Sequence, residues 1–250
     1  VLTDTKGELY KLTAKYLEKK GYEVKAFNLV NLACSDRWNP LDVIEEDLDA
    51  QVLAQVVIDN TEGKKDIQFW SNAEMNLLKA LVLYVKENYE KEYQNMGSMY
   101  KLLTTCSTQK LDKMFSHISN DRASKMAYNL YSQAPDNVRG GIVIGLGTRL
   151  QIFQERLVRK MTEVSDIDLY APKLRKCAYF CIIPDTHVAF NFLANLFFSF
   201  LFIKLVKITD MTDDPEIKNR DVFFILDEFP NIGKLPDFSK KIATVRSRRL

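Results

Sequence analysis

The chain has 250 residues, 46% of them hydrophobic and 27% charged, which is the composition of an ordinary folded protein of one or two domains. Its 9 Gly and 7 Pro are too few for a collagen-like or low-complexity chain. With only 4 Cys it is not a disulfide scaffold, and a reducing, cytoplasmic setting fits best. Lys and Arg total 35 against 33 Asp and Glu, and the resulting net charge of +2 excludes the global positive field of many nucleic-acid-binding proteins.

The N-terminal part carries the pattern of a strand, a helix and a second strand. Val1–Asp4 and Tyr22–Leu29 are rich in residues that favour strands, and Glu8–Lys20 between them has helical spacing. The side chains that we expect this helix to point inward are Leu9, Leu12, Tyr16 and Leu17. Such a βαβ unit predicts a parallel sheet.

Residues 48–162 show almost no strand signal. The helices predicted there span 49–59, 71–93, 108–116, 121–132 and 136–160, with a short one starting at Gly97. Ser71 and Glu74 have the spacing of a capping box that opens the second of these helices. We therefore predict an all-α domain, residues 48–162, inserted into an α/β domain made of residues 1–47 and 163–250.

The sheet is expected to resume at Cys177–Ile183, followed by a long apolar helix from His187 to Ile208. This helix is apolar enough to be taken for a membrane span, but Asn195 and Ser199 interrupt it, and we favour a core helix packed on the sheet. A further apolar run, Val222–Leu226, is typical of a strand buried on both faces.

Asp227 and Glu228 follow that apolar run and give it the form of a Walker B element. At the carboxyl end of a parallel strand, the first acid would hold Mg²⁺, mostly through water, and the second would activate a water for attack on a γ-phosphate. The alternative is a core strand that ends in a solvated acidic turn. The partner motif of Walker A, which cradles the phosphates, does not occur in these 250 residues. Gly140 and Gly145 have part of its spacing but lie in a predicted helix, which favours a role in helix packing.

Four ordered segments resemble the VirD4/TraG family of type IV secretion coupling proteins. The segments are Thr3-Asp4-Thr5-Lys6-Gly7-Glu8, Ser35-Asp36-Arg37-Trp38-Asn39-Pro40, Leu226-Asp227-Glu228-Phe229-Pro230 with the loop after it, and Ala243-Thr244-Val245-Arg246-Ser247-Arg248. The resemblance implies a RecA-like P-loop nucleotide-binding domain, here partial, with an inserted all-α domain. It also identifies the chain as an internal fragment that lacks Walker A.

The resemblance implies roles for individual residues. Asp227 would bind the metal and Glu228 would be catalytic. Arg246 would be a catalytic arginine finger acting on the nucleotide of a neighbouring subunit, and a plain surface arginine is the alternative. Asp4 and Lys6 are candidates for cofactor binding near the nucleotide, with a turn-stabilising function as the alternative. ATP and Mg²⁺ are expected in the full-length protein, and the fragment itself is expected to require neither.

The family context implies a conjugative coupling ATPase that recruits and drives DNA or protein substrates into a type IV secretion channel. The expected partners are a relaxase or relaxosome, a secreted protein substrate, DNA, and components of the channel. A homo-hexamer at the cytoplasmic face of the cell membrane is expected, with the membrane anchor outside this fragment. Two alternatives remain open: a non-catalytic all-α docking module, and a DNA translocase of the FtsK or HerA type.

Overall fold

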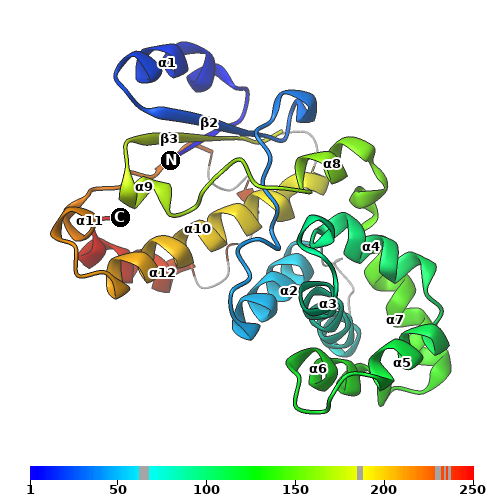
Figure 1. Cartoon of the computed structure of the whole chain (residues 1–250). Helices are drawn as coiled ribbons and strands as arrows, with labels where there is room; N and C mark the ends of the chain where they lie inside the picture. Colours follow the sequence, from blue (N-terminus) through cyan, green and yellow to red (C-terminus); the bar gives the residue numbers. More distant parts are fainter. Residues whose placement is uncertain (62–67, 185–187, 229–231, 234, 236–237) are drawn as a thin grey trace. The chain divides into compact units, whose positions relative to one another are not determined.

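The computed structural model describes residues 1–61, 68–184, 188–228, 232–233, 235 and 238–250. The chain forms two compact units. The first comprises Val1–Trp38 and Ser165–Leu250 and contains a sheet, and the second comprises Asn39–Val164 and is built from helices (Figure 1).

The first unit is organised around a parallel sheet with the strand order β2-β3-β1-β4. Its described strands are β1 (Leu2–Asp4), β2 (Glu23–Asn28), β3 (Cys177–Ile182) and β4 (Ile225–Leu226). Asp4 pairs with Ile182, and Ile182 with Asn28, so these strands finish at a common edge. The prediction of an α/β fold, with a parallel sheet interrupted by a set of helices, is confirmed.

Helices cover both faces of this sheet (Figure 1). The other described elements of the unit are α1 (Glu8–Lys19), η1 (Leu32–Cys34), α9 (Ala171–Leu174), η4 (Val188–Phe190), α10 (Asn191–Met211), α11 (Pro215–Asn219), α12 (Phe238–Val245) and η6 (Arg246–Arg248). On one face, the ring of Tyr10 in α1 meets Phe180 edge-on at 5.3 Å. On the other, Phe197 of α10 stacks on Phe27 at 5.2 Å. Neighbouring positions of a strand face opposite sides, so a single sheet layer supplies both contacts.

Helix α10 is a core helix. It is long and apolar enough to cross a membrane, but 78% of its apolar window is buried inside the protein. Its polar residues Asn195 and Ser199 are themselves buried, and the Asn195 amide donates to the carbonyl of Ile232. The helix begins at Asn191, and His187, where the sequence pattern placed its start, lies outside the described residues.

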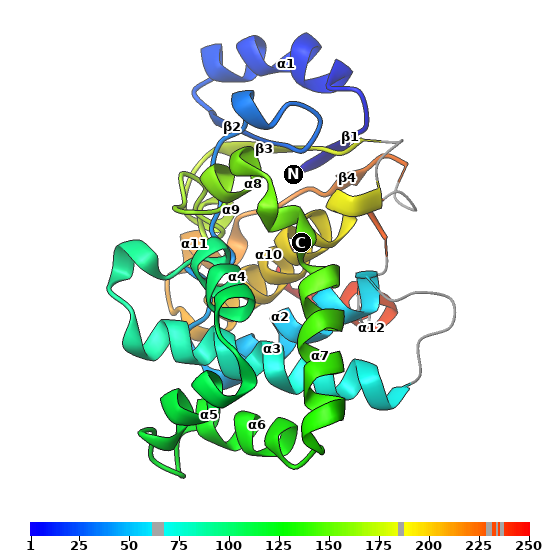
Figure 2. The same ribbon diagram turned by 90° about the vertical axis from the view of Figure 1, so that its right-hand side faces the viewer.

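The second unit is built around helix α3. Its elements are α2 (Asp47–Thr61), α3 (Gln68–Asn88), η2 (Lys91–Tyr93), α4 (Met96–Thr105), α5 (Thr108–Ser116), α6 (Ala123–Ser132), α7 (Asp136–Arg149), η3 (Gln151–Gln154) and α8 (Arg156–Met161). Helix α3 packs against α2, α4, α6 and α7, and Figure 2 shows α7 crossing it. It therefore buries apolar residues on several faces, among them Leu77, Leu81 and Val85.

Two predictions about α1 and α3 are wrong. Of the four side chains predicted to point inward from α1, Leu9 and Leu17 do pack against the sheet, together with Tyr10. Leu12 and Tyr16 lie on the other side of the helix and are 79% and 61% exposed. Hydrogen bonds from the first turn of α1 to Asp4 fix this rotation of the helix. Ser71 and Glu74 do not form a capping box, since α3 begins at Gln68 and both side chains are buried inside it.

Two other elements are shorter than predicted. The helix expected over 136–160 is divided into α7, η3 and α8, with the break at Leu150 and not at the glycines.

The strand ending in Asp-Glu is not buried on both faces. β4 has β1 as its described neighbour, and Phe223 and Ile225 are 74% and 53% exposed. An apolar run shows that a segment favours a sheet, but it does not show that both faces are covered.

The segment Ser35–Asn39 joins the two units, and each of its side chains has a structural role. Ser35 and Asp36 accept hydrogen bonds from backbone amides of β2. Trp38 is fully buried, and its ring meets Phe27 and Phe197 edge-on. Arg37 binds both carboxylate oxygens of Asp166 at 2.8 and 3.0 Å, and its backbone N–H and C=O also bind Asp166. Asn39 donates to the carbonyl of Gln94.

We predict that Glu74→Ala destabilises the helical unit by about 3–5 kcal/mol. The Glu74 carboxylate meets the Arg149 guanidinium at 2.5 Å, and both side chains are more than nine-tenths buried. Removal of the Glu74 carboxylate leaves the Arg149 guanidinium buried in the core without its ion-pair partner, which is energetically costly. Chemical denaturation measures the loss, and the exposed Glu155→Ala is the control, expected to change the free energy of unfolding by less than about 0.5 kcal/mol. A similar stability for both variants would contradict the prediction.

Candidate functional site

Asp227 and Glu228 lie immediately after β4, at the edge where the parallel strands finish. β1 and β4 pair at Thr3 with Leu226, so Asp4 and Asp227 are the next residues along the two strands. The Thr3 hydroxyl donates to the Asp227 carbonyl at 2.6 Å and fixes this end of the pairing. Both acidic side chains are exposed. The sheet therefore presents two carboxylates to solvent at its ligand-binding edge.

The backbone of this turn is unusual. Glu228 adopts φ = +46°, the left-handed region that non-glycine residues seldom occupy. Its N–H donates to the Asp227 carboxylate at 3.0 Å. Strained backbone of this kind persists where surrounding structure holds it, and it is concentrated at functional sites.

Asp4 stabilises the turn that follows β1. Its carboxylate is 3% exposed and accepts hydrogen bonds from the N–H groups of Glu8 (3.0 Å) and Tyr10 (2.9 Å), at the start of α1. Gly7 has φ = +71°, which glycine adopts without steric cost. Lys6 is exposed in the same turn. Asp4 and Lys6 thus lie at the same edge as Asp227, and Asp4 acts there as a helix cap.

Arg246 is not brought to that edge. It begins the turn after α12, is exposed, and makes no side-chain hydrogen bond or ion pair to another described residue. The turn is anchored through Arg249, whose carbonyl accepts from Val222 N–H at 2.9 Å. Val222 precedes β4, whereas Asp227 follows it. The anchor of the turn and the acidic pair therefore lie at opposite ends of β4.

Ion pairs hold the turn in place. Arg248 binds both carboxylate oxygens of Asp210 at 2.7 and 2.8 Å, and this pairing lowers the pKa of the Asp210 carboxyl. Arg249 meets Asp221 at 3.2 Å. Arg246 is accordingly the arginine of this turn whose guanidinium points to no carboxylate among the described residues.

The residues at the sheet edge suit Mg²⁺ held mainly by water and phosphate. In the described part of the chain, no three His, Cys, Asp or Glu side chains converge as a metal cage. Mg²⁺ does not need such a cage, because it keeps several waters and takes one or two carboxylates. Asp227 is an exposed oxygen donor that fits this requirement, whereas both oxygens of Asp4 already accept backbone hydrogen bonds.

Of the two glycines singled out in the sequence, Gly145 serves helix packing, whereas Gly140 has open space around it; Gly141 also packs closely. A Cβ on Gly141 would lie 3.2 Å from the Trp70 ring, and a Cβ on Gly145 would overlap the Glu74 carboxylate. Neither glycine lies in a phosphate-binding loop, since α7 is helical throughout.

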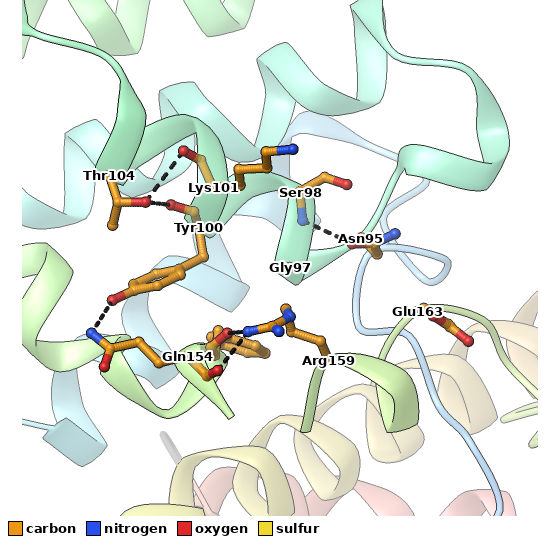
Figure 3. Close-up of a pocket in the computed structure, with 10 residues that line it drawn as sticks. Asn95, Gly97, Ser98, Tyr100, Lys101, Thr104, Gln154, Arg159 and Glu163 are labelled. Carbon is orange, nitrogen blue, oxygen red and sulfur yellow. Dashed lines mark hydrogen bonds between the residues drawn. The ribbon is translucent and has the colours of Figure 1, made fainter. Parts of the chain in front are cut away.

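A second candidate site is a pocket of about 570 Å³ on the helical unit (Figure 3). The pocket is lined by Asn95, Gly97, Ser98, Tyr100, Lys101, Thr104, Phe153, Gln154, Arg159 and Glu163. Lys101 and Arg159 both lie at it, and neither forms an ion pair with a described residue. Gln154 donates to the Tyr100 hydroxyl at 2.9 Å, and Arg159 donates to two carbonyls of η3. These hydrogen bonds fix the side chains and the η3 segment that line the pocket.

The sequence pattern did not reveal Thr3 or the pocket residues. Thr3 acts through the register of β1 with β4, and a register is a property of the folded sheet. Lys101 and Arg159 lie far apart in the chain, and the folded helical unit brings both to the lining of one pocket.

Comparisons with known proteins agree with this geometry. Residues 1–249 match the family described as "Type IV secretory system Conjugative DNA transfer". VirD4 of Rhizobium rhizogenes and VirD4 of Agrobacterium fabrum are each 25% identical over 98% of this chain and 37% of their own length. The conjugal transfer protein TraG of Escherichia coli is 23% identical over 98% of the chain and 42% of its length.

Two solved structures share the fold. The unbound conjugative coupling protein TrwBdeltaN70 matches with a TM-score of 0.62 at 14% identity, over 100% of this chain and 60% of that one. TrwB in complex with the non-hydrolysable ATP analogue ADPNP matches with 0.59 at 14% identity, over 100% and 61%. The chain thus spans less than two thirds of these structures and about two fifths of the curated relatives' length. By its match from end to end, the chain belongs to the type IV secretory system conjugative DNA transfer family, the family of VirD4 and TraG.

Proposed function

We propose that this chain supplies the magnesium-binding, water-activating and arginine elements of an ATPase that drives DNA or protein substrates into a type IV secretion channel. In this proposal, residues 1–47 and 163–250 form part of the nucleotide-binding domain, and residues 48–162 form the inserted all-α domain. The observation that carries it is the exposed Asp227–Glu228 pair at the carboxyl edge of a parallel sheet. TrwB, which shares the fold, has been solved with an ATP analogue, which supports nucleotide binding as part of the proposal.

Each site residue has a distinct task in the proposal. Asp227 would hold Mg²⁺, which neutralises charge on the β- and γ-phosphates when bound. Glu228 would orient and deprotonate the attacking water. Lys6 would face the nucleotide from the turn that Asp4 holds by capping α1.

Arg246 would act on the nucleotide of a neighbouring copy. Its turn is anchored at the end of β4 opposite Asp227, which favours an action outside its own subunit. An arginine in that role stabilises the charge that develops during phosphoryl transfer. This requires a ring of copies, and we propose a homo-hexamer at the cytoplasmic face of the cell membrane, anchored by a segment outside this chain.

A specific observation favours a second task, recognition of substrate by the all-α domain. The pocket of Figure 3 is lined by Lys101 and Arg159, by the rings of Tyr100 and Phe153, and by one acidic residue, Glu163. Two cations beside aromatic rings suit an acidic segment of a protein substrate, such as a relaxase or another relaxosome component. DNA and channel components would then be engaged by other parts of the assembly.

Glu228→Gln, made in the natural protein that carries this chain, is expected to lower kcat for ATP hydrolysis by about 10²–10⁴-fold, because a general base is lost. Nucleotide affinity should stay within about twofold, since the neutral side chain keeps its shape. Glu216→Gln, on the exposed surface of α11, is the matched control. Full hydrolysis by the Glu228 variant would contradict the proposal.

Asp4→Asn separates the capping role from direct binding of the cofactor. We expect it to destabilise the chain by about 1 kcal/mol, the usual cost of a weakened helix cap, as measured by thermal unfolding. Mg²⁺-dependent nucleotide binding should persist in this variant and be lost in Asp227→Asn. Loss of nucleotide binding in a stably folded Asp4 variant would instead assign Asp4 to the cofactor.

Lys101→Glu tests the pocket. With the relaxase of the same transfer system as the probe, calorimetry should show binding weakened at least about tenfold, which corresponds to about 1.4 kcal/mol. Lys113→Glu on α5 makes the same charge change away from the pocket and should bind normally. Equal affinities of the two variants would rule out the pocket as the docking site.

A further inference from the structure

Lys173 is a lysine that lies fully inside the protein. It belongs to the short helix α9 and is 0% exposed, and burial lowers the pKa of its ammonium group. A buried ammonium group is costly unless it is hydrogen-bonded. Its Nζ donates to two backbone carbonyls, those of Arg220 and Arg248, each at 2.7 Å.

The two carbonyls belong to two different segments. Arg220 lies in the segment that leads into β4 and, through it, to Asp227. Arg248 lies in the turn that begins with Arg246. Lys173 thus connects the strand of the acidic pair to the turn of the arginine, and α9, α11 and the C-terminus are neighbours in Figure 1.

Other contacts make the connection rigid. Val222 N–H donates to the Arg249 carbonyl at 2.9 Å, and Leu250 N–H donates to the Val245 carbonyl at 3.3 Å. The ion pair of Arg248 with Asp210 holds the same turn against α10. Arg246 is therefore an exposed side chain on a turn whose backbone is fixed on three sides.

We propose that Lys173 is a positioning residue for Arg246, which fixes the arginine turn to the segment entering β4 so that the two move as one body. The inference rests on the proposed role of Arg246 in ATP hydrolysis. The inference adds a mechanical link within one copy of the chain. A displacement of the strand that carries Asp227 and Glu228 would also move Arg246, which the same copy presents to its neighbour. A methionine at this position keeps the volume of lysine and removes both donors.

The first test is amide hydrogen exchange of the 250-residue chain. In Lys173→Met, exchange at Val222 and Leu250 should rise about tenfold or more, while amides of the β2–β3 ladder keep their protection. Lys173→Arg, which retains a cation with several donors, should restore protection, and Lys176→Met, an exposed lysine of the same region, should have no effect. Unchanged exchange at Val222 and Leu250 would overturn the proposal. If the methionine variant does not fold, Lys173→Gln, which keeps one donor, is judged by the same outcomes.

The second test is a double-mutant cycle on ATP hydrolysis by the natural protein. Lys173→Met should lower kcat about tenfold or more with KM within about twofold, and should have no further effect once Arg246 is replaced by Ala. Equal losses with and without Arg246 would show a structural role unrelated to positioning. If Arg246→Ala leaves kcat unchanged, the proposed function of Arg246 fails, and the exchange result still decides whether Lys173 joins the two segments.

Discussion

The site depends on the parallel pairing of β1 with β4. Because both strands run in the same direction and pair at Thr3 with Leu226, the residues that follow them meet at one edge. The hydrogen bond from Thr3 to the Asp227 carbonyl holds this register at the position where the chain leaves the sheet. A shift by one residue would turn every side chain of β4 to the other face and would carry Asp227 away from the turn that Asp4 caps.

Much of this arrangement was predictable from the sequence. Alternation of strand and helix patterns indicated a parallel sheet, and the long stretch without strand signal indicated the helical insertion. The errors have different physical causes, one local and one distant in the sequence. Leu12 and Tyr16 have the spacing of a buried face, but hydrogen bonds to Asp4 set the rotation of α1. Ser71 and Glu74 have the spacing of a cap, but Glu74 pairs with Arg149, which is distant in the sequence. Local patterns do not carry partners that only the fold brings close.

The charged groups of the chain divide into two kinds. Those assigned to chemistry, Asp227, Glu228 and Arg246, are exposed and belong to turns. Of those that hold the fold, Lys173 and the Glu74–Arg149 pair are buried, whereas the Arg248–Asp210 and Arg249–Asp221 pairs are partly exposed. Composition cannot separate the two kinds, because both are counted in the same net charge. The structural groups are identified by the partners that they bind, and those partners are a property of the folded chain.

The Arg37–Asp166 contact has a consequence for how such a protein is assembled from modules. The chain leaves the sheet-containing unit after Trp38 and re-enters it at Ser165, and Arg37 and Asp166, next to these two points within that unit, are joined by backbone and side-chain hydrogen bonds. The two ends of the inserted segment are therefore held close together by the Arg37–Asp166 contact. A short linker between Trp38 and Ser165 would leave the path of the sheet-containing unit undisturbed, so a helical module of a different length or surface can be exchanged there without changes to that unit.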